Sequence, residues 1–172
     1  DGTLADCNGK IPESVISAIK YFMSEGGRFT VCTGRIFQGF HLYSEEYINA
    51  PVLLGNGAMA YDYKNKEIVF NDAIGHAEVN YLKTTGEYIE ILKRGVDKGT
   101  GLLKLGEMLG CEPCDIYAAG DGYNDVDMLR AAAKGFVPEN GSQEALAVAD
   151  YVTRTNNDGC IAHAIEILDK LY

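Results

Sequence analysis

Four short segments of this 172-residue chain carry side chains that could hold a phosphate group and a hard metal cation. Carboxylate oxygens suit Mg²⁺, which usually binds one or two of them together with waters and substrate oxygens. Hydroxyls, lysines and N–H groups in glycine-rich turns suit phosphate, most of all where a helix begins. The four segments are Asp1-Gly2-Thr3, Thr33-Gly34-Arg35, Lys98-Gly99-Thr100 and residues 120–125.

The carboxylates in these segments predict the metal. Asp1, Asp121 and Asp125 offer oxygen ligands, and they would repel a phosphate unless a cation lay between. Mg²⁺ is therefore the expected cofactor. A calcium loop of the EF-hand type is the alternative at this position. That loop needs oxygen donors at alternate positions and glycine at the sixth, and Tyr123 and Val126 interrupt such a pattern here.

The other polar groups predict how phosphate would be held. Thr33 offers a hydroxyl, Gly34 an unhindered N–H at the start of a predicted helix, and Lys98 a point charge. Each group alone has a simpler interpretation. Thr33 could cap a helix, Lys98 could face solvent, and the Asp-Gly turns could be solvated turns. The combination, and no single segment, indicates a site.

Apolar patterns predict alternating strands and helices, which would bring the four segments together. Short apolar strands alternating with helices indicate an α/β fold, with a parallel sheet covered by helices on both faces. Ligands of such sheets bind beyond the carboxyl ends of the strands. The expected helices cover residues 12–26, 36–48, 76–83, 99–109, 124–133, 142–149 and 159–172. The expected strands cover residues 29–32, 51–54, 87–92, 115–119, 135–137 and 151–153, with a hairpin over 59–70.

The composition restricts the partners and the compartment. The net charge is −10 and no cluster of Lys and Arg appears, which argues against a nucleic-acid partner. No apolar run approaches the ~18 residues of a membrane helix. Five cysteines, an odd number, favour a reducing cytoplasm over secretion. The spacing of Cys111 and Cys114 also fits a redox pair or half a zinc site, although two free thiols are the simpler interpretation. Nothing in the sequence indicates an oligomeric state.

Taken in order, the four segments resemble the motifs of the haloacid dehalogenase superfamily of phosphotransferases. Asp1-Gly2-Thr3-Leu4 is similar to the end of its first motif, Thr33-Gly34-Arg35 to its second and Lys98-Gly99 to its third. Residues 120–129 are similar to its fourth motif, which is the most specific. Features that resemble the Cof-like sugar-phosphatase branch are Pro12, Asn56-Gly57-Ala58, Asn140-Gly141 and Asn157-Asp158-Gly159.

The resemblance implies a Rossmann-like core and hydrolysis of phosphate monoesters through an aspartyl-phosphate, with Mg²⁺ bound. It implies that Asp1 is a general acid and base whose main-chain carbonyl also binds the metal. Lys98 would be the catalytic charge partner of the phosphoryl group. The implied phosphate-binding residues are Thr33, Gly34, Lys98 and Asn124, and the implied metal-binding residues are Asp1, Asp121 and Asp125.

The chain departs from the family pattern in two ways. The family's nucleophile is an Asp two residues before the position of Asp1, and Cof-like members insert an α/β cap domain between the second and third motifs. Residues 59–97 include a predicted hairpin and strand, which leaves no room for a domain of ~50 residues. We therefore expect part of a longer protein, with core residues 1–75 and 88–172 and a cap remnant or excision point at 76–87.

Three functions fit this sequence. The leading expectation is a Mg²⁺-dependent phosphatase for small phosphorylated metabolites, with sugar phosphates as the expected substrates. A phosphomutase would use the same motifs and pass the phosphoryl group to a second hydroxyl instead of water. A non-catalytic module that binds metal and sugar phosphate would lack the nucleophile.

Overall fold

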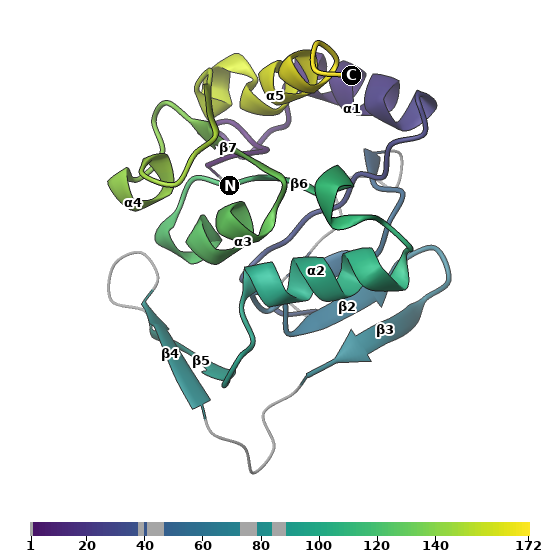
Figure 1. Ribbon diagram of the computed structural model, residues 1–172, viewed down its shortest axis with the longest axis vertical. Helices are drawn as coiled ribbons and strands as arrows, with labels where there is room; N and C mark the ends of the chain where they lie inside the picture. The colour runs from purple at the N-terminus through teal and green to yellow at the C-terminus, as the bar shows by residue number, and fades with distance from the viewer. Residues whose placement is uncertain (1, 38–39, 41–46, 73–78, 84–88) are drawn as a thin grey trace.

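The computed structural model of the protein describes residues 2–37, 40, 47–72, 79–83 and 89–172 (Figure 1). The expected alternation of strands and helices is present across these ranges. The first half contains α1 (Glu13–Ser24), β1 (Val52–Leu54), β2 (Met59–Asp62), β3 (Glu67–Asn71), β4 (Val79–Lys83) and β5 (Ile89–Lys93). The second half contains α2 (Lys98–Met108), β6 (Tyr117–Ala119), α3 (Val126–Ala131), β7 (Lys134–Pro138), α4 (Gln143–Leu146), β8 (Tyr151–Thr153) and α5 (Cys160–Leu168).

A parallel sheet in the order β6-β7-β8 forms the centre of the second half. Phe136 in β7 pairs with Ala119 on one side and with Tyr151 on the other, so all three strands end at the same edge. Helices α1 and α5 lie side by side over this part of the chain (Figure 1). Their apolar faces meet through Val15 and Ile19 on α1 and through residues near the start of α5. The α/β class with a parallel sheet is therefore confirmed.

The first half adds an antiparallel sheet in the order β1-β2-β3, with α2 packed against it. The predicted hairpin is confirmed, because β2 and β3 pair antiparallel over residues 59–71. The strand expected over residues 29–32 is reduced to one parallel bridge, between Cys32 and Leu53. Backbone bonds from Leu53 N to Val31 O and from Thr33 N to Leu53 O, each 2.9 Å long, continue that pairing. These bonds fix where Thr33 leaves the sheet.

One element differs from the prediction. The helix expected over residues 76–83 is wrong for its described part, because Val79–Lys83 form strand β4, paired antiparallel with β5. A weak helical pattern is readily overridden by pairing with a partner strand, since tertiary context outweighs local propensity. The strand expected near residues 87–92 is confirmed as Ile89–Lys93. Most of the helix expected over residues 36–48 lies outside the described residues.

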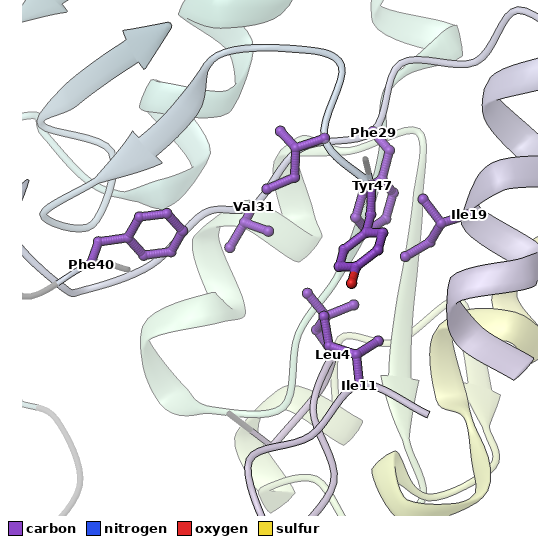
Figure 2. Close-up of a pocket in the computed structure, with 8 residues that line it drawn as sticks. Leu4, Ile11, Ile19, Phe29, Val31, Phe40 and Tyr47 are labelled. Atoms are coloured by element: carbon purple, nitrogen blue, oxygen red, sulfur yellow. The ribbon is translucent and has the colours of Figure 1, made fainter. Parts of the chain in front are cut away.

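A small apolar cavity of about 30 Å³ lies between α1 and the segment that leads to Thr33 (Figure 2). Figure 2 shows the Tyr47 ring between Ile19 of α1 and the N-terminal residues Leu4 and Ile11. Its apolar lining marks it as a gap in the core and not as a polar binding site. Within the described ranges, no helix has both the length and the apolar character needed to cross a membrane.

Candidate functional site

The turn after β6 supplies the acidic part of the site. Gly120 N donates to Phe136 O over 3.1 Å, which ties the turn to β7, and Ser142 N donates to Asp121 O over 2.8 Å. The Asp125 side chain then folds back on the turn. Its Oδ2 accepts from the N–H groups of Asp121 and Gly122 at 3.0 and 2.9 Å. Asp125 therefore shapes the turn that presents Asp121 and Asn124.

Lys98 reaches this turn from the first residue of α2. Asp97 caps the helix, since its side chain accepts from Thr100 N at 2.8 Å while Thr100 Oγ1 accepts from Asp97 N at 3.0 Å. Lys98 Nζ lies 2.5 Å from Asp125 Oδ1. Burial is the largest single influence and lowers the pKa of Lys98, but the charge and hydrogen bond of Asp125 together with the nearby Cys32 and Asp121 raise it more, so the net pKa lies above its ordinary value. Lys98 is thus a fixed cation at the edge of the sheet.

Thr33 and Gly34 follow the parallel bridge at Cys32. Thr33 Oγ1 accepts from Arg35 N over 3.2 Å, a local bond within the turn that follows the bridge. A hydroxyl that accepts in this way still carries its own hydrogen as a donor. The bond from Arg35 N and phosphate binding are therefore compatible for Thr33.

A buried turn joins Thr33 to the acidic segment. Asn56 has a left-handed φ of 52° and no exposed surface. Its N–H donates to Thr33 O over 2.9 Å, and its Oδ1 accepts from Asn124 Nδ2 over 3.2 Å. The second and fourth motif segments are therefore connected through one residue.

The N-terminal segment packs directly on Asp121. The Thr3 hydroxyl donates a short hydrogen bond to Asp121 Oδ1. A Cβ at Gly2 would overlap the Asp121 carboxylate, so only glycine permits this approach. Below the segment, Cys160 Sγ donates to Thr3 O over 2.8 Å. The predicted catalytic and metal-binding residue Asp1 itself lies outside the described residues.

The described donors fit Mg²⁺ with Asp121 as its carboxylate. Among the side chains that the structure describes, which exclude that of Asp1, no group of three or more His, Cys, Asp or Glu residues could hold a metal. Mg²⁺ does not require such a group, because one or two carboxylates suffice when waters and substrate oxygens complete its shell. Asp125 fits direct binding less well, because Lys98 and two N–H groups already occupy its oxygens.

The structure brings together most of the predicted site residues, and it adds two that the sequence reasoning missed. Asp125 bonds Lys98 and the backbone N–H of Asp121 directly. Asn124 is joined to Thr33 through one intermediate residue, Asn56. Thr3 and Asn56 are the additions. Thr3 was visible only as a neighbour of Asp1. The Asn56-Gly57-Ala58 sequence resembles the Cof-like branch, but it does not show which side chain Asn56 contacts.

Comparisons with known proteins identify a matching family model and similar folds. The family model of haloacid dehalogenase-like hydrolases matches residues 1–85 and residues 76–165. A solved haloacid dehalogenase-like hydrolase from Bacteroides thetaiotaomicron is 18% identical, with a TM-score of 0.84 over 98% of this chain and 96% of that one. A solved sugar phosphatase of subclass IIB is 17% identical, with a TM-score of 0.87 over the same shares of the two chains. These two structures show the fold.

The sequence relatives are longer than this chain. A phosphoglycolate phosphatase of Methanococcoides burtonii is 32% identical over 114 residues, which are 60% of this chain and 50% of that protein. The chain therefore spans about half the length, or less, of the curated relatives it matches.

Proposed function

Because this chain belongs to the haloacid dehalogenase-like hydrolase family, we propose that it is part of a Mg²⁺-dependent phosphatase for small phosphorylated metabolites. The observation that carries the proposal is the buried pair of Lys98 and Asp125 beside Asp121. The pair lies beside Asp121, a carboxylate of the kind that Mg²⁺ binds, at the edge where parallel sheets bind ligands. Phosphoryl transfer depends mostly on positioning and charge stabilisation, and this arrangement provides both.

Each site residue has a distinct part in this proposal. Thr33, Gly34 and Asn124 donate hydrogen bonds to the oxygens of the phosphoryl group, and Lys98 balances their charge. Asp121 and Asp1 hold Mg²⁺, with Asp125 supporting that group through the turn it shapes. When bound, Mg²⁺ neutralises the negative charge that phosphate and carboxylate would otherwise share.

The proposed reaction has two steps. An Asp carboxylate upstream of Asp1 attacks phosphorus and forms an aspartyl-phosphate, while the bond to the leaving oxygen breaks and the Asp1 carboxyl gives that oxygen its proton. Water then attacks the aspartyl-phosphate and gives a proton back to Asp1, which releases orthophosphate. The nucleophile belongs to this proposal through the family pattern, and Asp1 stands two residues after its position.

Sugar phosphates are the substrates that we propose to test first. A sugar phosphatase shares the fold, and a phosphoglycolate phosphatase is among the sequence relatives. The family model matches two segments that overlap at residues 76–85, which supports a cap remnant or excision point at residues 76–87 between the two core parts. The five cysteines are free thiols, which fits the proposed cytoplasmic location.

Hydrolysis of p-nitrophenyl phosphate and a panel of sugar phosphates by the full-length protein, with Mg²⁺, tests this function. Asp121→Asn and Lys98→Met are expected to lower orthophosphate release by at least ~10²-fold. Glu107→Gln, an exposed carboxylate on the same helix as Lys98, is the matched control and keeps full activity. Full activity in Asp121→Asn would refute the assignment. Conversion of a hexose 1-phosphate to its 6-phosphate without release of orthophosphate would identify a phosphomutase instead.

A further inference from the structure

The turn of Gly55, Asn56 and Gly57 contacts three of the four motif segments. Asn56 N bonds Thr33 O of the second segment, and Asn56 Oδ1 bonds Asn124 of the fourth. Gly57 packs against α2 directly beside the third segment, because a Cβ added to Gly101, the residue after that segment, would lie 2.6 Å from Gly57 Cα. The turn therefore lies where these segments meet.

The Asn56 amide fixes the orientation of the Asn124 amide. Asn56 Oδ1 can only accept, so it pairs with the Nδ2 end of Asn124. The other end of that amide lies over Gly122, because a Cβ added there would come within 2.9 Å of Asn124 Oδ1. Nδ2 carries two hydrogens, so one can bond Asn56 while the second can still donate to a ligand.

Asn56 occupies a conformation and an environment that both carry a cost. A left-handed φ of 52° is easier for glycine than for asparagine, and a buried amide costs free energy unless it is hydrogen-bonded. Glycine at this position would relieve the backbone and would remove the buried amide. Among the contacts that asparagine makes and glycine cannot make is the side-chain bond to Asn124.

We propose that Asn56 is a positioning residue that orients Asn124 toward the transferring phosphoryl group. This inference rests on the proposed phosphatase function. In this proposal Asn56 does not contact the substrate. Asn56 affects catalysis only through Asn124.

A double-mutant cycle on the full-length protein tests this role, with Asn56→Gly, Asn124→Ala and the double variant. Asn56→Gly is expected to lower kcat/KM for p-nitrophenyl phosphate about tenfold, which is the effect of one lost hydrogen bond. In the Asn124→Ala background, Asn56→Gly is expected to change kcat/KM by less than about twofold, because the residue it acts through is gone. Asn56→Asp keeps an acceptor for Asn124 and is expected to retain more kcat than Asn56→Gly.

Lys66→Gly is the matched control, because Lys66 is exposed, lies in the β2–β3 turn and has a similar φ of 56°. It relieves the same kind of backbone conformation and is expected to leave kcat and KM unchanged. Equal losses from Asn56→Gly in both backgrounds would overturn the positioning role while leaving the phosphatase intact.

A second readout separates failure of this inference from failure of the proposed function. Urea unfolding of the same four proteins measures the coupling between the two amides without any turnover. An additive cycle in unfolding means that the bond contributes nothing, and it overturns the inference. If the wild-type protein hydrolyses none of the phosphates, the proposed phosphatase function is overturned. The catalytic role inferred for Asn56 is then overturned with it.

Discussion

Lys98 Nζ and Asp125 Oδ1 lie 2.5 Å apart, and their side chains are only 7% and 8% exposed. The second oxygen of Asp125 accepts two backbone N–H groups of the acidic turn. One carboxylate thus connects the start of α2 to the turn after β6. A buried ion pair of this kind is weak evidence for stability, but loss of one partner is strongly destabilising. Because this ion pair lies within the site, variants of Lys98 and Asp125 test whether the pair holds the site residues together.

Asp125→Asn is expected to lower the free energy of unfolding by about 3 kcal/mol, because it leaves a buried ammonium without its counter-charge. Lys98→Met is expected to cost less, since the two backbone N–H groups still satisfy Asp125. The double variant should recover part of the loss from Asp125→Asn. Urea unfolding measures all three, and a double variant whose loss equals the sum of the single losses would show that the pair does not act as a unit.

Gly101→Ala is expected to lower the free energy of unfolding by about 1–3 kcal/mol. The new methyl would meet the backbone of Gly57, which cannot move without shifting the turn that holds Asn56. Gly106→Ala on the same helix is the control, because its methyl meets only the end of the Ile116 side chain. That clash is relieved by a side-chain rotation, and alanine also has the better helix propensity. Equal losses at the two positions, in urea unfolding, would contradict the predicted contact with the Gly57 backbone.

Cys160 is expected to make the protein less stable in alkali. Burial, with the nearby charge of Asp121, raises the pKa of this thiol from 9.0 to about 12. The unfolded thiol ionises near pH 9 while the folded one stays neutral, so stability is complete below pH 9 and falls as pH rises toward 12. The slope for one such thiol is about 1.4 kcal/mol per pH unit.

Cys160→Ala should remove this slope. Urea unfolding of both proteins at a series of pH values measures the slope. The stability that Cys160→Ala loses at pH 7 to 8 measures the packing contribution of the thiol separately. The two proteins should converge in stability above pH 9. An unchanged difference between them from pH 7 to pH 11 would mean that the thiol does not titrate as its environment implies.

Thr3→Val is expected to lower phosphatase activity about tenfold, because Asp121 loses the hydroxyl that holds its carboxylate in place. Thr3→Ser keeps the hydroxyl and should restore most of the activity. Titration of orthophosphate release against Mg²⁺ concentration measures the effect, which should appear as a higher Mg²⁺ requirement. An unaltered Mg²⁺ requirement in Thr3→Val would show that Thr3 does not orient Asp121.

Apolar spacing alone predicted the helices and strands whose patterns are strong and local. Residues 99–109 and 159–172 repeat apolar side chains at helical spacing, and α2 and α5 formed there. The motif residues around Asp121 were identifiable because they combine with the other three polar segments, since a Gly-Asp turn alone is usually a solvated turn. The edge of the sheet where they meet followed from parallel strand topology.

Tertiary structure decided everything that depends on contact between distant segments. Strand β4 exists because β5 pairs with it, and a local pattern cannot show a partner strand elsewhere in the chain. The burial of Lys98 against Asp125, the hydroxyl of Thr3 on Asp121 and the Asn56–Asn124 bond each join residues far apart in sequence. Hydrogen bonds and ion pairs require distances of about 3 Å, and only the packed chain sets distances of that size between remote residues.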